Sequence, residues 1–414
     1  MATTAAQAAT TSTSTSALTF DIVKKCSTTK ARAANLTLPH GLVETPMFMP
    51  VATQASLKGL TPEQLEDLGC KLCLNNTYHL GLKPGKDVLD AIGGAHKLQS
   101  WNRNILTGMF QMVSLLKLAK ITEEGVRFLS PHDGSPMLLT PEHSIEIQNS
   151  IGSDIIMQLD DVVHTLTTGE RLEEAMYRSI RWLDRCVGAN KNPDRQNLFA
   201  IIQGGLDLNL RRICCEEMAK RDTPGIAIGG LSGGEAKDAY CKVVNHCTDL
   251  LPKHKPIYCM GVGYAEDMVV SVAMGVDLFD CVYPTRTARF GNAITAKGVL
   301  NLRNNCYRTD FGPVEEGCKC PICIPKYKGG MGITRSLVHH LAAKETSGAH
   351  LLTLHNVHYQ LNLMRQARDA IIKDEFPQFV KQFFATLHGG DKSNYPEWAI
   401  EALRAVNIDL IEEH

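Results

Sequence analysis

The sequence predicts an α/β protein of the TIM (β/α)8 barrel type that carries one inserted, cysteine-rich subdomain. From about Gly125 onward, short apolar runs alternate with amphipathic helical stretches at roughly thirty-residue spacing, which is typical of βα units and a parallel sheet. Each run is followed by a polar residue or a glycine, as expected where a barrel places its active site at the carboxyl ends of the strands. The segment from Cys306 to Tyr327 breaks this pattern and has no helical or strand period. A doubly wound sheet would give similar local patterns and stays the alternative.

The five clearest strands are short and apolar throughout, as strands covered on both faces should be. The predicted strands are Ile155–Leu159, Leu198–Ile202, Ile226–Ile228, Ile257–Met260 and Val276–Phe279. The residues that end or directly follow them are Asp160, Gln203, Gly229, Gly261 and Asp280.

Helices are predicted between and after these strands. Thr167 and Glu170 form a capping box that should begin one helix, and Tyr264–Met274 is a second helical stretch. A C-terminal helical part follows His355. The apolar positions that define the first and last of these helices are Leu172, Met176, Ile180 and Leu183, and Leu361, Met364, Ala367 and Ile371.

Length and composition leave room for a large enzyme. The chain has 414 residues, 44% of them hydrophobic, which suits one large barrel with an appendage or two to three smaller domains. The net charge is −1, so a nucleic-acid partner would need Lys and Arg concentrated locally. No secretory signal precedes the 14 cysteines, which therefore indicate a reducing compartment, and no apolar stretch reaches the length of a membrane span.

Four segments are expected along the chain. Residues 1–17 form a low-complexity tail of Ala, Thr and Ser that should be disordered, with a targeting role as the alternative. Residues 18–304 form the main part of the barrel and 305–360 a zinc-binding insertion. Residues 361–414 form a helical part that completes the barrel.

The insertion holds a candidate metal site. Cys318, Cys320 and Cys323 place three thiols within six residues, close enough to converge on one tetrahedral Zn²⁺. His355 is the best fourth ligand, with His350 and His340 as rivals. A Cys₃His set leaves no open position, so the metal should be structural.

Asp280 is the candidate reactive carboxylate. It follows an apolar strand and precedes a stretch in which Arg286 and Arg289 bracket Thr287, so cations and hydroxyls lie next to an acid at the barrel mouth. Such a carboxylate can attack an electrophilic carbon, and its neighbours can hold nucleic-acid phosphates. Capping a helix or pairing with an arginine is the alternative for any aspartate at the end of a strand.

At this point the chain resembles one family, the queuine tRNA-ribosyltransferases, over nearly all residues after the tail. The matching motifs are Thr45–Pro50, Asn76–Leu80, Gln158–Asp161, Ile202–Gly205, Gly229–Glu235, Met260–Gly263, Phe279–Arg286, the three cysteines and His355–Asn356. The resemblance implies a TIM barrel with a structural zinc and exchange of guanine at wobble position 34 of GUN-anticodon tRNAs for queuine. It also implies a heterodimer with a related, non-catalytic accessory subunit. The implied location is the cytoplasm, with peripheral association with the mitochondrial outer membrane as a second site.

The resemblance also implies roles for single residues. Asp280 would be the nucleophile that forms a covalent ester with the ribose. Asp160, Gln203 and the backbone of Gly230 would read the base edge, and Phe110 and Met260 would stack on its two faces. A glycine at 233 would leave room for the cyclopentenediol arm of queuine. The implied RNA contacts are Gly261, Val262, Gly263, Tyr264, Ala265, Glu266 and Asp267, together with Thr285, Arg286, Thr287, Ala288 and Arg289.

One motif departs from the family pattern. The family has Asp-Ser-Gly-Gly between Leu-Thr and Phe-Gln-Met, whereas here Thr107 and Phe110 are separated only by Gly108 and Met109. The missing Asp serves the family as general acid and base, and its loss should cost on the order of a hundredfold to ten-thousandfold in rate. A catalytically impaired tRNA-binding subunit is therefore the second hypothesis. A zinc-stabilised barrel hydrolase for small molecules is a third, and it leaves the basic stretch after Asp280 unexplained.

Overall fold

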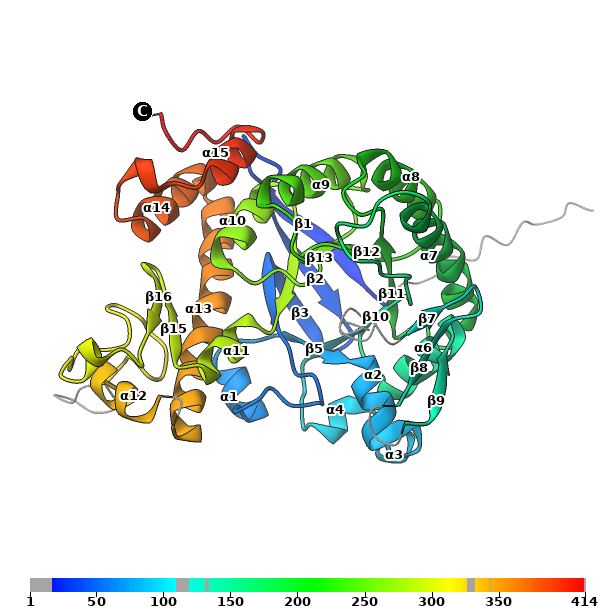
Figure 1. Ribbon diagram of the computed structural model, residues 1–414, viewed down its shortest axis with the longest axis horizontal. Coiled ribbons are helices and arrows are strands. Elements are labelled where there is room, and N and C mark those ends of the chain that lie inside the picture. Colours follow the sequence, from blue (N-terminus) through cyan, green and yellow to red (C-terminus); the bar gives the residue numbers. More distant parts are fainter. Residues whose placement is uncertain (1–16, 109–118, 131–133, 326–331, 343, 413–414) are drawn as a thin grey trace, which may run out of the picture.

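An eight-stranded parallel barrel forms the centre of the computed structural model (Figure 1), which describes residues 17–108, 119–130, 134–325, 332–342 and 344–412. The strands are β4 (Met47–Pro50), β5 (Leu72–Asn76), β6 (Asn104–Gly108), β10 (Ile155–Met157), β11 (Asn197–Ile202), β12 (Gly225–Ile228), β13 (Ile257–Cys259) and β14 (Leu278–Cys281). They follow one another around the sheet in chain order, and β14 pairs with β4. A parallel bridge between Val51 and Leu74 brings β4 to β5, so the barrel is nearly closed. The predicted fold class and all five predicted strands are confirmed.

The barrel strands are buried on both faces, which explains their uniformly apolar character. Every residue of β11 is buried, for example, because one face fills the barrel and the other lies under helices. Phe199 of β11 lies in register with Gly225 of β12. A Cβ atom at Gly225 would come within 2.2 Å of the Phe199 ring, so the glycine makes room for that side chain.

Helices surround the barrel (Figure 1). In chain order they are α1 (Pro62–Asp67), α2 (Thr77–Leu80), the π-helical turn η1 (Gly81–Gly85), α3 (Lys86–Ile92), α4 (Ala95–Leu98), α6 (Pro141–Ile151), α7 (Glu170–Ala189), α8 (Leu208–Ala219), α9 (Lys237–Leu250), α10 (Ala265–Ala273) and α11 (Tyr283–Arg289). The predicted start of α7 is wrong in detail. The helix begins at Glu170 with Gly169 as its N-cap, because the Thr167 N–H is used by a preceding turn that closes on the His164 carbonyl at 2.8 Å.

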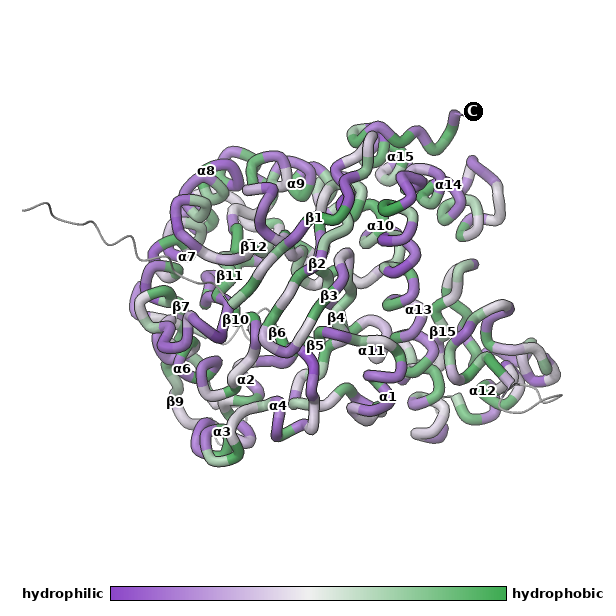
Figure 2. The backbone as a smooth tube through the Cα atoms, turned by 180° about the vertical axis from the view of Figure 1, so that it is seen from behind, coloured by the Kyte–Doolittle hydropathy of each residue, from purple (hydrophilic) through white to green (hydrophobic). Residues whose placement is uncertain are grey.

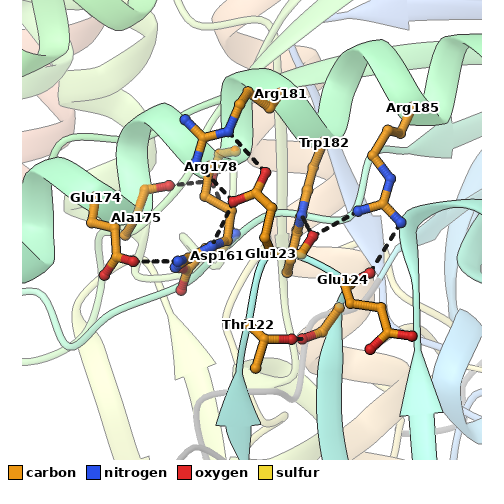
Figure 3. A network of polar contacts seen from close by, with 12 residues as sticks. Thr122, Glu123, Glu124, Asp161, Glu174, Ala175, Arg178, Arg181, Trp182 and Arg185 are labelled. Carbon is orange, nitrogen blue, oxygen red and sulfur yellow. Dashed lines mark hydrogen bonds and ion pairs between the residues drawn. The ribbon is translucent and has the colours of Figure 1, made fainter.

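A polar network fastens α7 to a small antiparallel sheet of β7 (Lys120–Ile121), β8 (Val126–Leu129) and β9 (Pro136–Leu139) (Figure 3). Arg178 donates to Asp161 at 2.6 Å and to Glu123 at 3.3 Å, and Arg171 donates to both Asp161 oxygens at 2.6 and 2.9 Å. Asp161 is thereby engaged in the structural network, which leaves its neighbour Asp160 to face the barrel mouth.

The opposite end of the barrel is covered by an antiparallel sheet of β1 (Thr19–Lys25), β2 (Arg32–Leu38) and β3 (Gly41–Thr45), which lies across the barrel in Figure 2. Arg32 donates to both oxygens of Asp277, just before β14, at 2.9 and 2.6 Å. The His40 N–H donates to Asn104, the first residue of β6, at 3.1 Å. These contacts lie at the amino ends of the strands, so the carboxyl ends are left for the site.

An appendage lies beside the barrel on the α11 side (Figure 1). It contains β15 (Asn292–Thr295), β16 (Gly298–Asn301), the 3-10 turn η2 (Asn305–Tyr307), α12 (Arg335–Leu341), α13 (Thr346–Ile372), α14 (Phe376–Leu387), η3 (Lys392–Asn394) and α15 (Glu397–Arg404). The four apolar positions predicted for the C-terminal helix are buried in α13, which begins earlier than expected and runs without a break through residue 360. The domain boundaries stay predictions. Across the described ranges, no helix combines the length and apolar character needed to cross a membrane.

Candidate active site and metal cluster

The carboxyl ends of five neighbouring barrel strands bring the predicted site residues together. Asp160 follows β10, Gln203 follows β11, Gly230 follows β12, Met260 follows β13, and Asp280 lies within β14. Because parallel strands end at the same face of a barrel, these residues converge although 120 positions separate the first from the last.

Asp280 is a buried carboxylate, 4% exposed, held by two donors at one oxygen. Its Oδ1 accepts a hydrogen bond from the Tyr258 hydroxyl at 2.5 Å and another from the Gly261 N–H at 2.7 Å. Burial raises the pKa of Asp280 to about 6, and the two hydrogen bonds oppose this rise. The group is therefore ionised at neutral pH yet sparsely hydrated, which is the state in which a carboxylate is an effective nucleophile.

Asp160 and Gln203 form a second polar pair at the mouth. The Gln203 Nε2 donates to Asp160 Oδ2 at 2.6 Å. Desolvation raises the pKa of Asp160 to about 6; the bond from Gln203 lowers it and the nearby charge of Asp161 raises it. Asp160 is partly exposed although protein surrounds its carboxyl group, so the residue lies at the edge of the core and not within it.

Glycines bring the backbone close to this pair. Gly230 has a φ of +67°, and a Cβ atom there would lie 2.3 Å from Gln203 Oε1. A Cβ atom at Gly229 would lie 2.6 Å from Ile201 and 3.4 Å from the Met260 sulfur. Both positions therefore require glycine, and the backbone of the β12 loop lies against the polar pair.

Phe110 and the shortened loop after β6 fall outside the described residues, since β6 ends at Gly108 and residues 109–118 are not described. The sequence itself contains no Asp or Glu from Trp101 to Lys117. Of the two residues predicted to stack on the base, Phe110 and Met260, only Met260 lies within the described residues.

The residues of the two predicted RNA-contact stretches divide by exposure. Gly261, Tyr264, Arg286 and Arg289 are exposed. The buried members are Val262, Gly263, Asp267, Thr285, Thr287 and Ala288, while Ala265 and Glu266 are intermediate. Glu266 lies 3.3 Å from His388 Nε2, and Asp267 forms an ion pair with Lys237. The exposed Arg286, Arg289 and Tyr264 side chains are thus available at the surface, while the buried residues of the two stretches anchor the backbone that carries them.

Several residues at the site were missed by sequence reasoning. Tyr258 precedes Asp280 by 22 positions, and no local pattern connects them. The Tyr283 ring lies 4.5 Å from the Tyr264 ring, centroid to centroid. Helix α13 also fixes both stretches: Gln360 donates to the Gly263 carbonyl at 2.7 Å, and Asn356 donates to the Pro284 carbonyl at 3.1 Å.

The appendage holds a metal-type cluster apart from the barrel mouth. Sulfur atoms of Cys318, Cys320 and Cys323 lie 3.9, 3.5 and 3.6 Å from His355 Nδ1. A tetrahedral zinc with ordinary bond lengths would separate sulfur and nitrogen ligands by about 3.6 Å, so the four donors fit one ion. The other ring nitrogen, His355 Nε2, donates to the Ile294 carbonyl at 2.9 Å, which leaves Nδ1 free of a proton for the metal.

The rival fourth ligands lie elsewhere. His350 contacts the Gln64 amide at 3.2 Å, and His340 is exposed. His355 therefore completes the predicted set, in an arrangement consistent with a metal site. The only other group of three such ligands in the described part of the chain is His40, His96 and Asp154 at the amino end of the barrel.

A parallel barrel with ionisable carboxylates at the carboxyl ends of its strands is the architecture of a barrel enzyme, and its appendage adds a Cys₃His cluster that is consistent with a metal site. The family model described as queuine tRNA-ribosyltransferase matches residues 26–389. The chain is 70% identical over 397 residues to the queuine tRNA-ribosyltransferase catalytic subunit of Schizosaccharomyces pombe, covering 95% of this chain and 98% of that protein.

More distant relatives agree with this match. The catalytic subunit of Caenorhabditis elegans is 52% identical over 369 residues, covering 88% of this chain and 90% of the relative. The queuine tRNA-ribosyltransferase of Caldanaerobacter subterraneus is 45% identical over 376 residues, covering 90% and 98%. The chain therefore belongs to the queuine tRNA-ribosyltransferase family of pentosyltransferases and is of the eukaryotic catalytic-subunit type, which confirms the resemblance and sets aside the small-molecule hydrolase.

Proposed function

We propose that this chain replaces guanine at wobble position 34 of GUN-anticodon tRNAs with queuine through a covalent ester between Asp280 and the ribose. The observation that carries the proposal is the geometry of Asp280. Both donors that hold the carboxylate, Tyr258 and Gly261, bind Oδ1. Oδ2 is therefore the oxygen that attacks, while Oδ1 stays fixed.

The reaction has two displacements at one carbon. Asp280 Oδ2 attacks C1′ of the nucleotide, so a carbon–oxygen bond forms while the bond from C1′ to guanine N9 breaks. The leaving guanine takes up a proton at N9. The incoming base loses its N9 proton and attacks C1′, and the ester bond breaks to restore the carboxylate. Two inversions retain the configuration of the ribose, as in retaining glycosidases.

The base is read by the polar pair and the β12 loop. Asp160 accepts from the purine N1–H and exocyclic N–H, and Gln203 and the Gly230 N–H donate to the acceptor edge, which matches the donor and acceptor layout of guanine. Met260 stacks on one face of the base and Phe110 on the other. The exposed Arg286 and Arg289 of α11 hold phosphates of the anticodon loop, whose unpaired bases leave the stack at small cost.

The appendage holds a structural zinc through Cys318, Cys320, Cys323 and His355. The ion cross-links the insertion to α13 and takes no part in the chemistry at the barrel mouth. Since Asn356 is adjacent to His355 and bonds the Pro284 carbonyl, the metal cluster also steadies the start of α11. The accessory subunit and the cytoplasmic and mitochondrial locations stay predictions; the names of the relatives, which are catalytic subunits, support the accessory subunit.

A second candidate function rests on the shortened loop after β6. The segment from Trp101 to Lys117 contains no Asp or Glu, so it offers no carboxyl group to transfer the N9 protons. An impaired chain would bind tRNA and assemble with its partner but form no ester. The two candidates therefore differ in whether Asp280 becomes covalently attached to tRNA.

Exchange of labelled guanine into a GUN-anticodon tRNA, measured with the accessory subunit present, tests the proposal. We expect exchange above background and a denaturation-resistant tRNA adduct, both lost in Asp280→Asn. Asp194→Asn is the matched control, because it removes an exposed carboxylate that precedes the amino end of β11, whereas the site lies at the carboxyl ends of the strands. An adduct that persists in Asp280→Asn would overturn the assignment of the nucleophile, and tRNA binding without any adduct would favour the second candidate.

A further inference from the structure

Gly233 lies against a side chain from another loop. A Cβ atom at this position would come within 2.2 Å of Thr165 Oγ1 and 3.3 Å of Thr165 Cβ. Gly233 does not have a left-handed φ, unlike Gly230 and Gly234. The glycine is therefore required here by the Thr165 hydroxyl and not by backbone conformation.

Thr165 is held in this position by its own loop. It is 4% exposed, whereas His164 and Leu166 on either side are exposed. The Thr167 N–H donates to the His164 carbonyl at 2.8 Å, and the Leu166 N–H donates to His164 Nδ1 at 3.3 Å. This turn fixes the chain five residues after Asp160 so that only the threonine points inward.

The facing loop is also rigid. Both Glu235 carboxylate oxygens accept backbone bonds, from the Ser232 N–H at 2.6 Å and the Gly233 N–H at 2.9 Å. Local hydrogen bonds therefore fix the shape of each loop, and the space that a glycine at 233 was expected to open is bounded by the Thr165 hydroxyl.

The position of the substituent on a 7-deazaguanine base directs that substituent toward the contact between Gly233 and Thr165. In a 7-deazaguanine, the substituent on C7 lies next to O6, on the same side of the bicyclic ring. If O6 faces the Gly230 N–H, a group on C7 extends along the β12 loop toward Gly233. A cyclopentenediol at that position carries two hydroxyls that need partners once they are out of water.

We propose that Thr165 is a specificity-determining residue that receives the hydroxylated substituent at position 7 of the incoming base. This inference rests on the proposed function and deepens it. The Thr165 methyl and Cβ form the wall of the arm pocket, and the Oγ1 hydroxyl exchanges a hydrogen bond with the diol. Unsubstituted guanine does not reach the hydroxyl.

The test compares binding of two bases to the zinc-loaded full chain by titration calorimetry, using queuine and guanine. Thr165→Val keeps the shape and removes the hydroxyl, so the ratio of queuine affinity to guanine affinity should fall about three- to tenfold, as one hydrogen bond predicts. Thr165→Ser keeps the hydroxyl and should restore a ratio within about twofold of the original. An unchanged ratio in Thr165→Val, or an equal fall in both variants, would overturn the inference.

A double-mutant cycle checks the contact itself. Gly233→Ala should weaken queuine binding at least about tenfold, since its Cβ meets Oγ1 at 2.2 Å. Thr165→Ala combined with Gly233→Ala should recover most of that loss, because the nearest remaining atom lies at 3.3 Å. Strictly additive effects would contradict the proposal. The binding measurements need no turnover. Absence of guanine exchange would therefore reject the proposed function, whereas the role of Thr165 is decided separately by the ratio of queuine affinity to guanine affinity.

Discussion

Replacing Tyr258 by Phe removes one of the two donors to the Asp280 carboxylate and leaves the ring in place. The hydroxyl donates to Oδ1 at 2.5 Å, and it opposes the rise that burial causes in the pKa of Asp280, which is about 6. The nucleophile must be ionised, so activity should fall as pH drops through about 6 in the unmodified protein. Removing the donor raises the pKa of Asp280 further.

The size of the effect follows from the strength of the bond. A hydrogen bond to a charged group contributes about 1.5–3 kcal/mol, and about 1.4 kcal/mol corresponds to one pH unit. We therefore expect the acid limb of the profile of kcat/KM against pH to move upward by about one to two pH units. At pH 7 the loss should be roughly twofold to tenfold, and most of it should be recovered near pH 9.

The assay is guanine exchange measured from pH 5.5 to pH 9. Tyr240→Phe is the control, because it also removes a buried tyrosine hydroxyl, one that bonds Ser271 at 2.8 Å and not the carboxylate. Its acid limb should coincide with that of the original protein. An acid limb in Tyr258→Phe that stays where it was, with the rate lowered equally at every pH, would refute the reasoning.

Two further predictions concern stability and metal. Burial raises the pKa of Asp280 from 3.8 to about 6, so the ionised carboxylate lowers the stability of the fold by about 3 kcal/mol above pH 6, and this cost disappears as pH falls toward 4. Asp280→Asn should therefore raise the melting temperature at pH 8 and scarcely change it near pH 4. An unchanged melting temperature at pH 8 would contradict this prediction. Native mass spectrometry should find one zinc per chain. Cys320→Ser or chelation should lower both the zinc content and the affinity for tRNA, because the effect passes through His355 and Asn356. Full tRNA binding by the metal-free protein would show that the cluster does not influence the RNA-binding surface.

The strands that sequence reasoning identified share one property. β10 to β14 are buried on both faces and therefore read as continuous apolar runs, a local signal that needs no knowledge of the fold. β6 was not among them, because its apolar centre is flanked by Asn104 and Thr107. Thr107 is buried only because Gln148 and Ser153 bond its hydroxyl, at 3.0 and 2.6 Å. Such partners come from distant segments and are invisible in the strand itself.

The site divides in the same way. Asp160 and Asp161 are identical residue types in consecutive positions, and only the resemblance to a family distinguished them. The structure gives the physical reason, since Arg171 and Arg178 occupy Asp161 while Asp160 is left with Gln203. Tyr258 gave no local signal, because its hydroxyl matters only through a carboxylate on the next strand.

The sequence by itself determined the βα alternation, the family and the thiol triplet, because apolar periodicity and ligand spacing are properties of neighbouring residues. The tertiary structure decided which oxygen of Asp280 is held, which histidine joins the cysteines, and what fills the space beside Gly233. Those outcomes depend on side chains from separate strands and loops meeting within about 3 Å, the range over which hydrogen bonds and steric contacts act. Barrel closure brings them to that range, and no spacing along the chain records it.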